Sequence, residues 1–136
     1  MKEIFFCIRA DRRYKAVKVL SRDATADCLT HKQMLEIEIM QKVKSLGKFD
    51  ALPQLLDIFP IVHDQQTIHM AMVMEVLGTD IGSFRRLSPK KTLPLYTVRI
   101  IMRQVVEGLV HLHSAGIVHT GICISVAMLH VPLTDV

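Results

Sequence analysis

The sequence lacks tryptophan, has few other aromatic residues, and contains no apolar run long enough to span a bilayer. Its N-terminal apolar run, residues 4–8, is too short for a signal peptide. The three cysteines, Cys7, Cys28 and Cys123, form no CxxC pair, which is typical of reduced thiols rather than of a disulfide framework. We therefore predict a cytoplasmic or nuclear protein with no membrane partner.

The chain has 136 residues, of which 50% are hydrophobic. This length is typical of a single domain. Its formal net charge is +4. The cations are scattered apart from short clusters such as Arg12-Arg13 and Lys90-Lys91. Scattered charge favours a solvated surface over a nucleic-acid interface, so we predict no nucleic-acid partner.

The region from Leu93 to Leu129 is the part around which the rest is organised, and it opens with the pattern of an amphipathic helix. Thr92 is a candidate N-cap, and Pro94 is tolerated in a first helical turn. Apolar residues then recur at steps of three and four, which predicts a stripe that faces a core. The stripe consists of Val98, Ile101, Met102, Val105, Leu109 and Leu112.

The predicted helix ends at Gly116, which can adopt the left-handed conformation of a helix terminus. The β-branched pair Ile117-Val118 then predicts a short buried segment. This segment leads into a loop that begins with His119, Thr120 and Gly121.

Two strands, Ile4–Arg9 and Tyr14–Leu20, are predicted near the N-terminus as a hairpin with a polar turn. Side chains alternate between the faces of a strand, so Ala16 and Lys18 share one face. A lysine in so apolar a strand either reaches water at an edge or has a dedicated partner.

A helix is predicted from Thr30 to Gly47, and it contains the candidate partner of that lysine. At 100° per residue Glu36 falls within an apolar arc, whereas Glu38 points away to solvent. Glu36 thus needs a cation and Lys18 needs a carboxylate, so we predict that the two form an ion pair. The alternative is that Lys18 lies at the surface and that Glu36 is unrelated to it. The apolar arc consists of Leu35, Ile39, Met40, Val43 and Leu46.

Two more strands, Leu55–Val62 and Ile68–Leu77, are predicted around a polar turn. The second is apolar on both faces, which is typical of buried core. Ile81–Leu87 then predicts a short helix, before the loop that precedes the long helix.

Three segments resemble protein kinases, and more narrowly the SR-protein kinases of the serine/threonine class. They read YKAVKVL, MVMEVLG and VVEGLVHLHSAGIVHTG. The resemblance implies an incomplete α+β kinase fold, with an antiparallel-sheet small lobe, its helix C, the hinge and the first helices of the large lobe. It implies residues 1–77 as the partial small lobe and 78–136 as the start of the large lobe, truncated at the catalytic loop.

The resemblance also implies a nucleotide site for ATP with Mg2+. Lys18 and Glu36 correspond to the pair that holds the α- and β-phosphates, and Ala16 to the roof over adenine. Met74 corresponds to the gatekeeper, and the backbone groups of Glu75 and Leu77 to the adenine contacts. The protein substrates implied for intact relatives are rich in Arg and Ser.

The catalytic loop departs from the family pattern His-Thr-Asp-x-Lys-x-x-Asn. After His119 and Thr120, Gly121 stands for the base aspartate, Cys123 for the lysine and Val126 for the metal-binding asparagine. The Gly-rich loop and the Asp-Phe-Gly segment are also missing from the 136 residues. We therefore predict that no catalytic residue or metal ligand is intact, through either a degenerate gene or an incorrectly joined end.

Two hypotheses follow: a kinase relative that binds ATP and has lost phosphotransfer, or an inactive remnant that works as a protein-interaction module. A metal site at His111, His113 and His119 is disfavoured, because residues two apart on a helix do not share a face. Cys123 has no base placed to make it a nucleophile.

Overall fold

The structure is a computed structural model that describes residues 3–8, 14–20, 31–62 and 68–128. It contains two compact units. The sheet unit comprises Met1–Lys48 and Pro53–Val76, and the helical unit comprises Phe49–Leu52 and Leu77–Val136.

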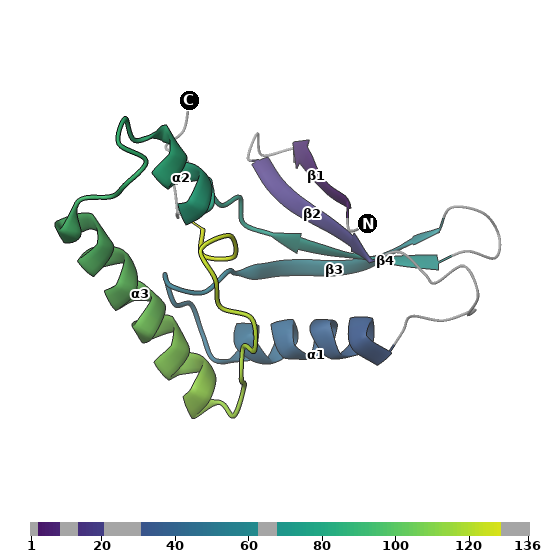
Figure 1. Cartoon of the computed structure of the whole chain (residues 1–136). Coiled ribbons are helices and arrows are strands. Elements are labelled where there is room, and N and C mark those ends of the chain that lie inside the picture. Colours follow the sequence, from purple (N-terminus) through teal and green to yellow (C-terminus); the bar gives the residue numbers. More distant parts are fainter. Residues whose placement is uncertain (1–2, 9–13, 21–30, 63–67, 129–136) are drawn as a thin grey trace. The chain divides into compact units, whose positions relative to one another are not determined.

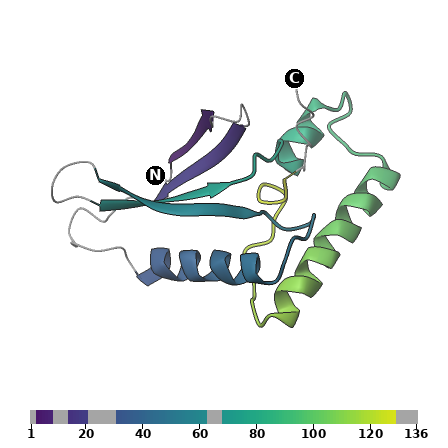
Figure 2. The same ribbon diagram turned by 180° about the vertical axis from the view of Figure 1, so that it is seen from behind.

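Four antiparallel strands and one helix make up the sheet unit (Figure 1). The sheet has the order β1-β2-β4-β3, and α1 lies along it in both Figures 1 and 2. The bounds are β1 Glu3–Ile8, β2 Tyr14–Leu20, α1 His31–Ser45, β3 Leu55–Val62 and β4 Ile68–Met74. The predicted hairpin and the second strand pair are confirmed, although β4 ends at Met74 and not at Leu77.

The two faces of the sheet carry separate apolar clusters. On the face toward α1, Leu20, Leu55 and Met72 are buried, and Ile37 and Met40 of α1 pack against them. The other cluster is built from Val17, Ala71 and Val73. Side chains on both faces of β4 are thus buried, as the apolar pattern of that strand predicted.

The packed side of α1 differs from the predicted arc. Ile37 and Met40 pack on the sheet and Val43 is buried, whereas Leu35 and Leu46 are exposed, so the arc was wrong at those two positions. The physical reason is that apolar residues lie on nearly every side of this helix. Its periodicity could not decide which side the sheet would cover.

The helical unit contains α2 (Ile81–Leu87) and α3 (Leu95–Ser114). The bounds of α2 agree with the prediction. The N-cap of α3 is Pro94, which makes no side-chain capping bond, so the prediction of Thr92 as the cap was wrong. A residue before proline is held in an extended conformation, and the helix therefore starts only after Pro94.

The end of α3 follows the prediction more closely. Gly116 has φ +70°, and the N–H of Ile117 donates to the carbonyl of Leu112 at 2.9 Å. Ile117 is buried, but Val118 is 71% exposed, so the expectation of a buried pair was wrong for Val118. Successive side chains of an extended segment point to opposite sides, and only one of the two can face the core.

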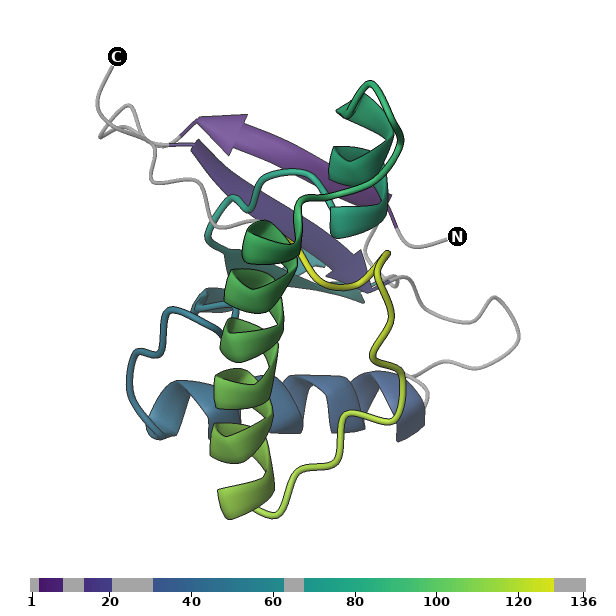
Figure 3. The same cartoon turned by 60° about the vertical axis from the view of Figure 1, so that its left-hand side comes forward.

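The segment that follows α3 runs back beside it towards α2 (Figure 3). Two backbone bonds join it to α2: Ile81 N–H donates to Ala127 O at 2.9 Å, and Gly82 N–H donates to Ile124 O at 3.0 Å. These two bonds attach the end of the predicted catalytic loop to the start of α2.

Phe49–Leu52 packs on α3 although it lies far from that helix in sequence. Leu52 is buried, and the rings of Phe49 and His111 stack with centroids 3.8 Å apart. A Cβ at Gly108 would lie 3.1 Å from the carbonyl oxygen of Ala51, so this close approach favours glycine. Among the described helices, none is both long and apolar enough to cross a membrane.

Candidate functional site

The first candidate residues lie on the face of the sheet that α1 covers. Ala16 is opposite Met74, and Lys18 is opposite Met72, across the antiparallel pair β2–β4. Directly opposed residues of an antiparallel pair share a face. The strands therefore bring Ala16, Lys18 and Met74, three residues predicted from the sequence, to one surface.

Lys18 and Glu36 form an ion pair between β2 and α1, with Lys18 Nζ donating to Glu36 Oε1. Their side chains are 15% and 26% exposed, so the pair is largely withdrawn from water. Glu38, two residues along α1, is exposed. The predicted distinction between the two glutamates is confirmed, and the lysine has the dedicated partner that its surroundings required.

The pair sits beside an apolar layer that fixes its two elements. Met40 and Ile37 of α1 pack on Leu20 and Met72, which are almost fully buried. Water is scarce there, so charges interact more strongly than at an open surface. Removing one partner would leave the other charge poorly solvated, and this favours the paired state.

The chain after β4 is anchored by a residue that sequence reasoning missed. Glu75 N–H donates to the carbonyl of Gln54 at 3.3 Å, and Gln54 N–H donates to Glu75 Oε1 at 3.0 Å. This reciprocal contact ties the end of β4 to the start of β3. No local signal pointed to Gln54, because the contact spans 21 positions of sequence. Leu77, the last of the predicted adenine contacts, is the first residue of the helical unit after the sheet unit ends.

The predicted catalytic loop lies in the helical unit. Thr120 has φ +62°, and Gly121 N–H donates to His119 Nδ1 at 3.2 Å. Thr120, Gly121, Cys123 and Val126 are all exposed. The backbone turn is well formed, but the side chains at these positions are a hydroxyl, a hydrogen, a thiol and an isopropyl group.

Cys123 is the one functional group in this loop with a shifted pKa among the described residues. Its Sγ lies 3.0 Å from Ser125 Oγ, and this hydrogen bond lowers the pKa of the thiol from its ordinary value. A lower pKa raises the thiolate fraction at neutral pH. Ser125, which the sequence analysis did not single out, is thus the neighbour that tunes this thiol.

Asp80 caps α2 at the point where the helix meets the returning segment. Its Oδ1 accepts from Ser83 N–H at 2.8 Å, and its Oδ2 accepts from Ser83 Oγ at 2.5 Å. The hydrogen bond from the Ser83 hydroxyl is the main reason that the pKa of Asp80 is lowered. The carboxylate is therefore engaged in capping the helix.

General acid–base chemistry needs a titratable group near the reacting atom, and phosphoryl transfer also needs metal ligands. Neither Gly121 nor Val126 supplies one. Within residues 3–8, 14–20, 31–62 and 68–128, no three His, Cys, Asp or Glu side chains gather to hold a metal ion. The described loop thus offers a thiol and no carboxylate.

Comparison with known proteins gives one matching family. Residues 2–125 match the family described as Protein kinase domain. The chain is 35% identical over 119 residues to the serine/threonine-protein kinase spk-1 of Caenorhabditis elegans, covering 82% of this chain and 11% of that protein. It is 34% identical over 116 residues to SRSF protein kinase 3 of Homo sapiens, covering 82% and 20% respectively.

A third relative is the probable dual specificity protein kinase YAK1 homolog of Encephalitozoon cuniculi, 27% identical over 117 residues. That match covers 86% of this chain and 27% of the relative. The chain thus spans between about a tenth and about a quarter of the length of the curated relatives that it matches.

Proposed function

Because this chain belongs to the protein kinase domain family and is similar to SR-protein-kinase-like serine/threonine kinases, we propose that it binds ATP without transferring phosphate. The observation that carries the proposal is the ion pair between Lys18 and Glu36. In the family such a pair orients the lysine toward the nucleotide's phosphates.

The sheet unit has groups that fit a nucleotide. Lys18 is a cation held in a set orientation by Glu36, which suits anionic phosphates. Ala16 and Met74 lie opposite each other on the same face, and both can contact an adenine ring. The backbone of Glu75 follows directly, held by Gln54, and Leu77 comes two residues later. In this proposal Lys18 binds phosphate, and the other residues contact the base.

The loop residues do not fit the metal and the base that phosphotransfer requires. Val126 has no ligand atom where the family has asparagine, and Gly121 has no carboxylate where the family has aspartate. A glycine cannot orient or deprotonate a substrate hydroxyl. In this proposal ATP is therefore a bound ligand and not a reactant.

Thermal unfolding with and without ATP tests the binding proposal. A ligand that binds only the folded state at 100 times its Kd adds about 2.7 kcal/mol of stability. We expect ATP to raise the unfolding temperature of the unaltered chain and of Lys15→Met, but not of Lys18→Met. Lys15 is the matched control. It lies three positions before Lys18 in the same strand, and residues an odd number of positions apart in a strand point to opposite faces. An equal ATP effect on Lys18→Met and Lys15→Met would overturn the proposal.

Transfer of labelled phosphate to an Arg/Ser-rich peptide tests the second half of the proposal. That peptide is the substrate class that the resemblance to SR-protein kinases implies. We expect no transfer above the enzyme-free blank, because Gly121 replaces the base. Measurable transfer by the unaltered chain would show that this assignment is wrong.

A second candidate function is a protein-interaction module, and the exposed apolar side chains of α3 favour it. Leu95, Tyr96, Val106 and Val110 are all exposed on this helix. Apolar surface of this extent tends to be covered by a partner. If this function holds instead, a partner protein will stabilise the chain and ATP will not.

A further inference from the structure

The turn between α2 and α3, residues 88–91, contains the one serine or threonine of the sequence that a proline follows directly. Ser88 N–H donates to Arg85 O at 3.2 Å, and Lys91 N–H donates to Ser88 O at 2.8 Å. Ser88 is extended, with φ −69° and ψ 135°, as expected of a residue before proline. The backbone thus holds Ser88 next to Arg85 on one side and next to Lys91 on the other.

The hydroxyl of Ser88 is free, in contrast to those of the other described serines. Within the part of the chain that the structure describes, Ser88 Oγ makes no hydrogen bond. The four other hydroxyls are engaged: those of Ser45, Ser83, Ser114 and Ser125. Leu87 and Pro89, which flank Ser88, are exposed, and Ser88 itself is partly exposed. An enzyme can therefore reach Ser88 Oγ without breaking a side-chain hydrogen bond.

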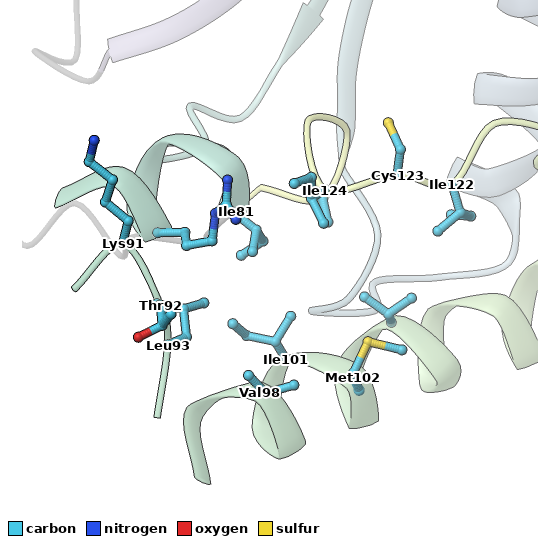
Figure 4. Close-up of a pocket in the computed structure, with 13 residues that line it drawn as sticks. Ile81, Lys91, Thr92, Leu93, Val98, Ile101, Met102, Ile122, Cys123 and Ile124 are labelled. Atoms are coloured by element: carbon cyan, nitrogen blue, oxygen red, sulfur yellow. The ribbon is translucent and has the colours of Figure 1, made fainter. Parts of the chain in front are cut away.

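Positive charge surrounds this hydroxyl. From Ile81 to Val106 the chain has no acidic residue. Arg85, Lys90 and Lys91 are exposed, and none of them forms an ion pair among the described residues. Figure 4 shows Lys91 beside an apolar pocket of about 430 Å³, with its ammonium group pointing away from the hollow. The charge of Lys91 is therefore free to meet an anion at the turn.

We propose that Ser88 is a phosphorylation site for a separate, proline-directed serine/threonine kinase. In the transfer, Ser88 Oγ loses its proton to a base of that kinase and forms a bond to the γ-phosphorus of ATP. The bond from this phosphorus to the β–γ bridging oxygen breaks, and ADP leaves. The chain is here the substrate, so the proposal does not depend on nucleotide binding by Lys18.

The residues after Ser88 supply the features that such a kinase selects. Pro89 has no N–H, so an active site that offers no acceptor at this position favours proline over other residues. Lys91 adds a cation three positions after the serine. The bond from Lys91 N–H to Ser88 O has to open for the segment to lie extended in an active site, and it belongs to an exposed turn.

The phosphorylated product fits the charges of the turn. Phosphoserine has a charge of about −1.5 to −2 at neutral pH and three acceptor oxygens. Ser88 is the C-cap of α2, and a helix C-terminus by itself disfavours an anion. Arg85, Lys90 and Lys91 oppose this effect, because all three lie within three positions of Ser88 and have no carboxylate partner among the described residues. The phosphate would thus link the end of α2 to the loop before α3.

Labelling of the full chain tests the proposal. The chain is incubated with labelled ATP and a purified proline-directed serine/threonine kinase, and the modified residue is located by mass spectrometry. We expect label on Ser88. Ser88→Ala should abolish it, and Ser88→Thr should retain it, because threonine also has a hydroxyl. Ser114→Ala is the matched control, since the hydroxyl of Ser114 is engaged with His111 O, and it should leave the labelling unchanged.

A reaction without the added kinase separates this proposal from the proposed function. We expect no label there. Label in that reaction would contradict the loss of phosphotransfer, and it would also overturn the assignment of Ser88 to a separate kinase. Absence of label in the complete reaction would overturn the phosphorylation site alone.

Variants beside Ser88 test how the segment is recognised. Pro89→Ala should lower the initial rate of labelling about tenfold, because it restores an N–H that has no acceptor in the active site. Lys91→Gln should lower the rate up to about fivefold, as expected for one exposed charge pair. Arg86→Gln is the control and should have no effect, since Arg86 is exposed but already donates to Ser83 Oγ at 2.6 Å.

Phosphorus NMR of the modified chain tests whether the cations hold the phosphate. The second pKa of the phosphate should be lower in the unaltered chain than in the double variant Arg85→Gln, Lys91→Gln, because both cations favour the dianion. We expect a difference of a few tenths of a pH unit, since pairs at exposed positions are weak. Arg86→Gln should leave this pKa unchanged.

Several results would overturn the proposal. They are an unlabelled full chain, whether or not a free peptide of residues 84–95 is labelled, and labelling of Ser88→Ala that equals labelling of the unaltered chain. Equal rates for Pro89→Ala and the unaltered chain would overturn the proline-directed class. An equal phosphate pKa with and without Arg85 and Lys91 would show that these cations do not hold the product.

Discussion

The ion pair of the sheet unit and the loop of the helical unit differ in how far packing constrains their side chains. The first brings together Lys18 and Glu36, the two residues predicted to pair, beside almost fully buried neighbours. The loop has a formed backbone turn, but Gly121, Cys123 and Val126 are exposed and none of them carries a carboxylate. Packing constrains residues at a buried site, whereas exposed catalytic residues are constrained mainly by chemistry.

The largest expected effect concerns the layer under the ion pair. Met72→Ala removes a side chain that is 1% exposed, and we expect a loss of about 3 kcal/mol in the free energy of unfolding. Met102→Ala, at a half-exposed position, should cost less than about 1 kcal/mol. Urea denaturation measures both, and equal costs would show that packing does not distinguish the two regions.

Two glycine substitutions, one at a packed position and one in the exposed loop, test the same difference within the helical unit. Gly108→Ala would place a Cβ 3.1 Å from Ala51 O, so we expect a loss of about 2 kcal/mol. At Gly121 the nearest atom to an added Cβ is His119 Nδ1 at 4.0 Å, and Gly121→Ala should change stability by less than about 0.5 kcal/mol. A large cost at Gly121 would mean that the loop is as constrained as the core.

Breaking the ion pair should have a smaller effect on stability. Glu36→Gln leaves Lys18 without its anion in a partly buried place, and we expect a loss of about 1 kcal/mol, between the values for exposed and buried pairs. Glu38→Gln, on the exposed side of α1, is the control and should be close to neutral. Urea denaturation of both variants measures the difference, and equal values would contradict a structural role for the pair.

The smallest expected effect is a pH dependence at Asp80. Hydrogen bonds from Ser83 lower the pKa of Asp80 in the folded state, so its contribution is present above the ordinary carboxyl pKa. That contribution is lost as the pH falls through the lowered pKa. We expect the thermal midpoint of the unaltered chain to fall more steeply in acid than that of Asp80→Asn, which can still cap α2. Parallel acid profiles would contradict this.

Much of the fold could be predicted because its signals are local. The alternation in β2 and the spacing within α1 placed Lys18 and Glu36 in position to meet, and Gly116 marked the end of α3. The Gln54–Glu75 contact could not be predicted in this way, since the two residues lie 21 positions apart in the sequence. Thr92 was expected to cap α3 because its residue type is favourable, but Pro94 determined the start.

The amino-acid sequence by itself determined the order of the elements, the candidate partner of Lys18 and the absence of a carboxylate at Gly121. These properties depend on residue chemistry and on the fixed periods of helix and strand. Only the tertiary structure decided which side of α1 faces the sheet, that Phe49–Leu52 packs on α3, and that Arg85 borders an apolar pocket. Those properties arise from contacts between segments far apart in the chain, and no local period records such contacts.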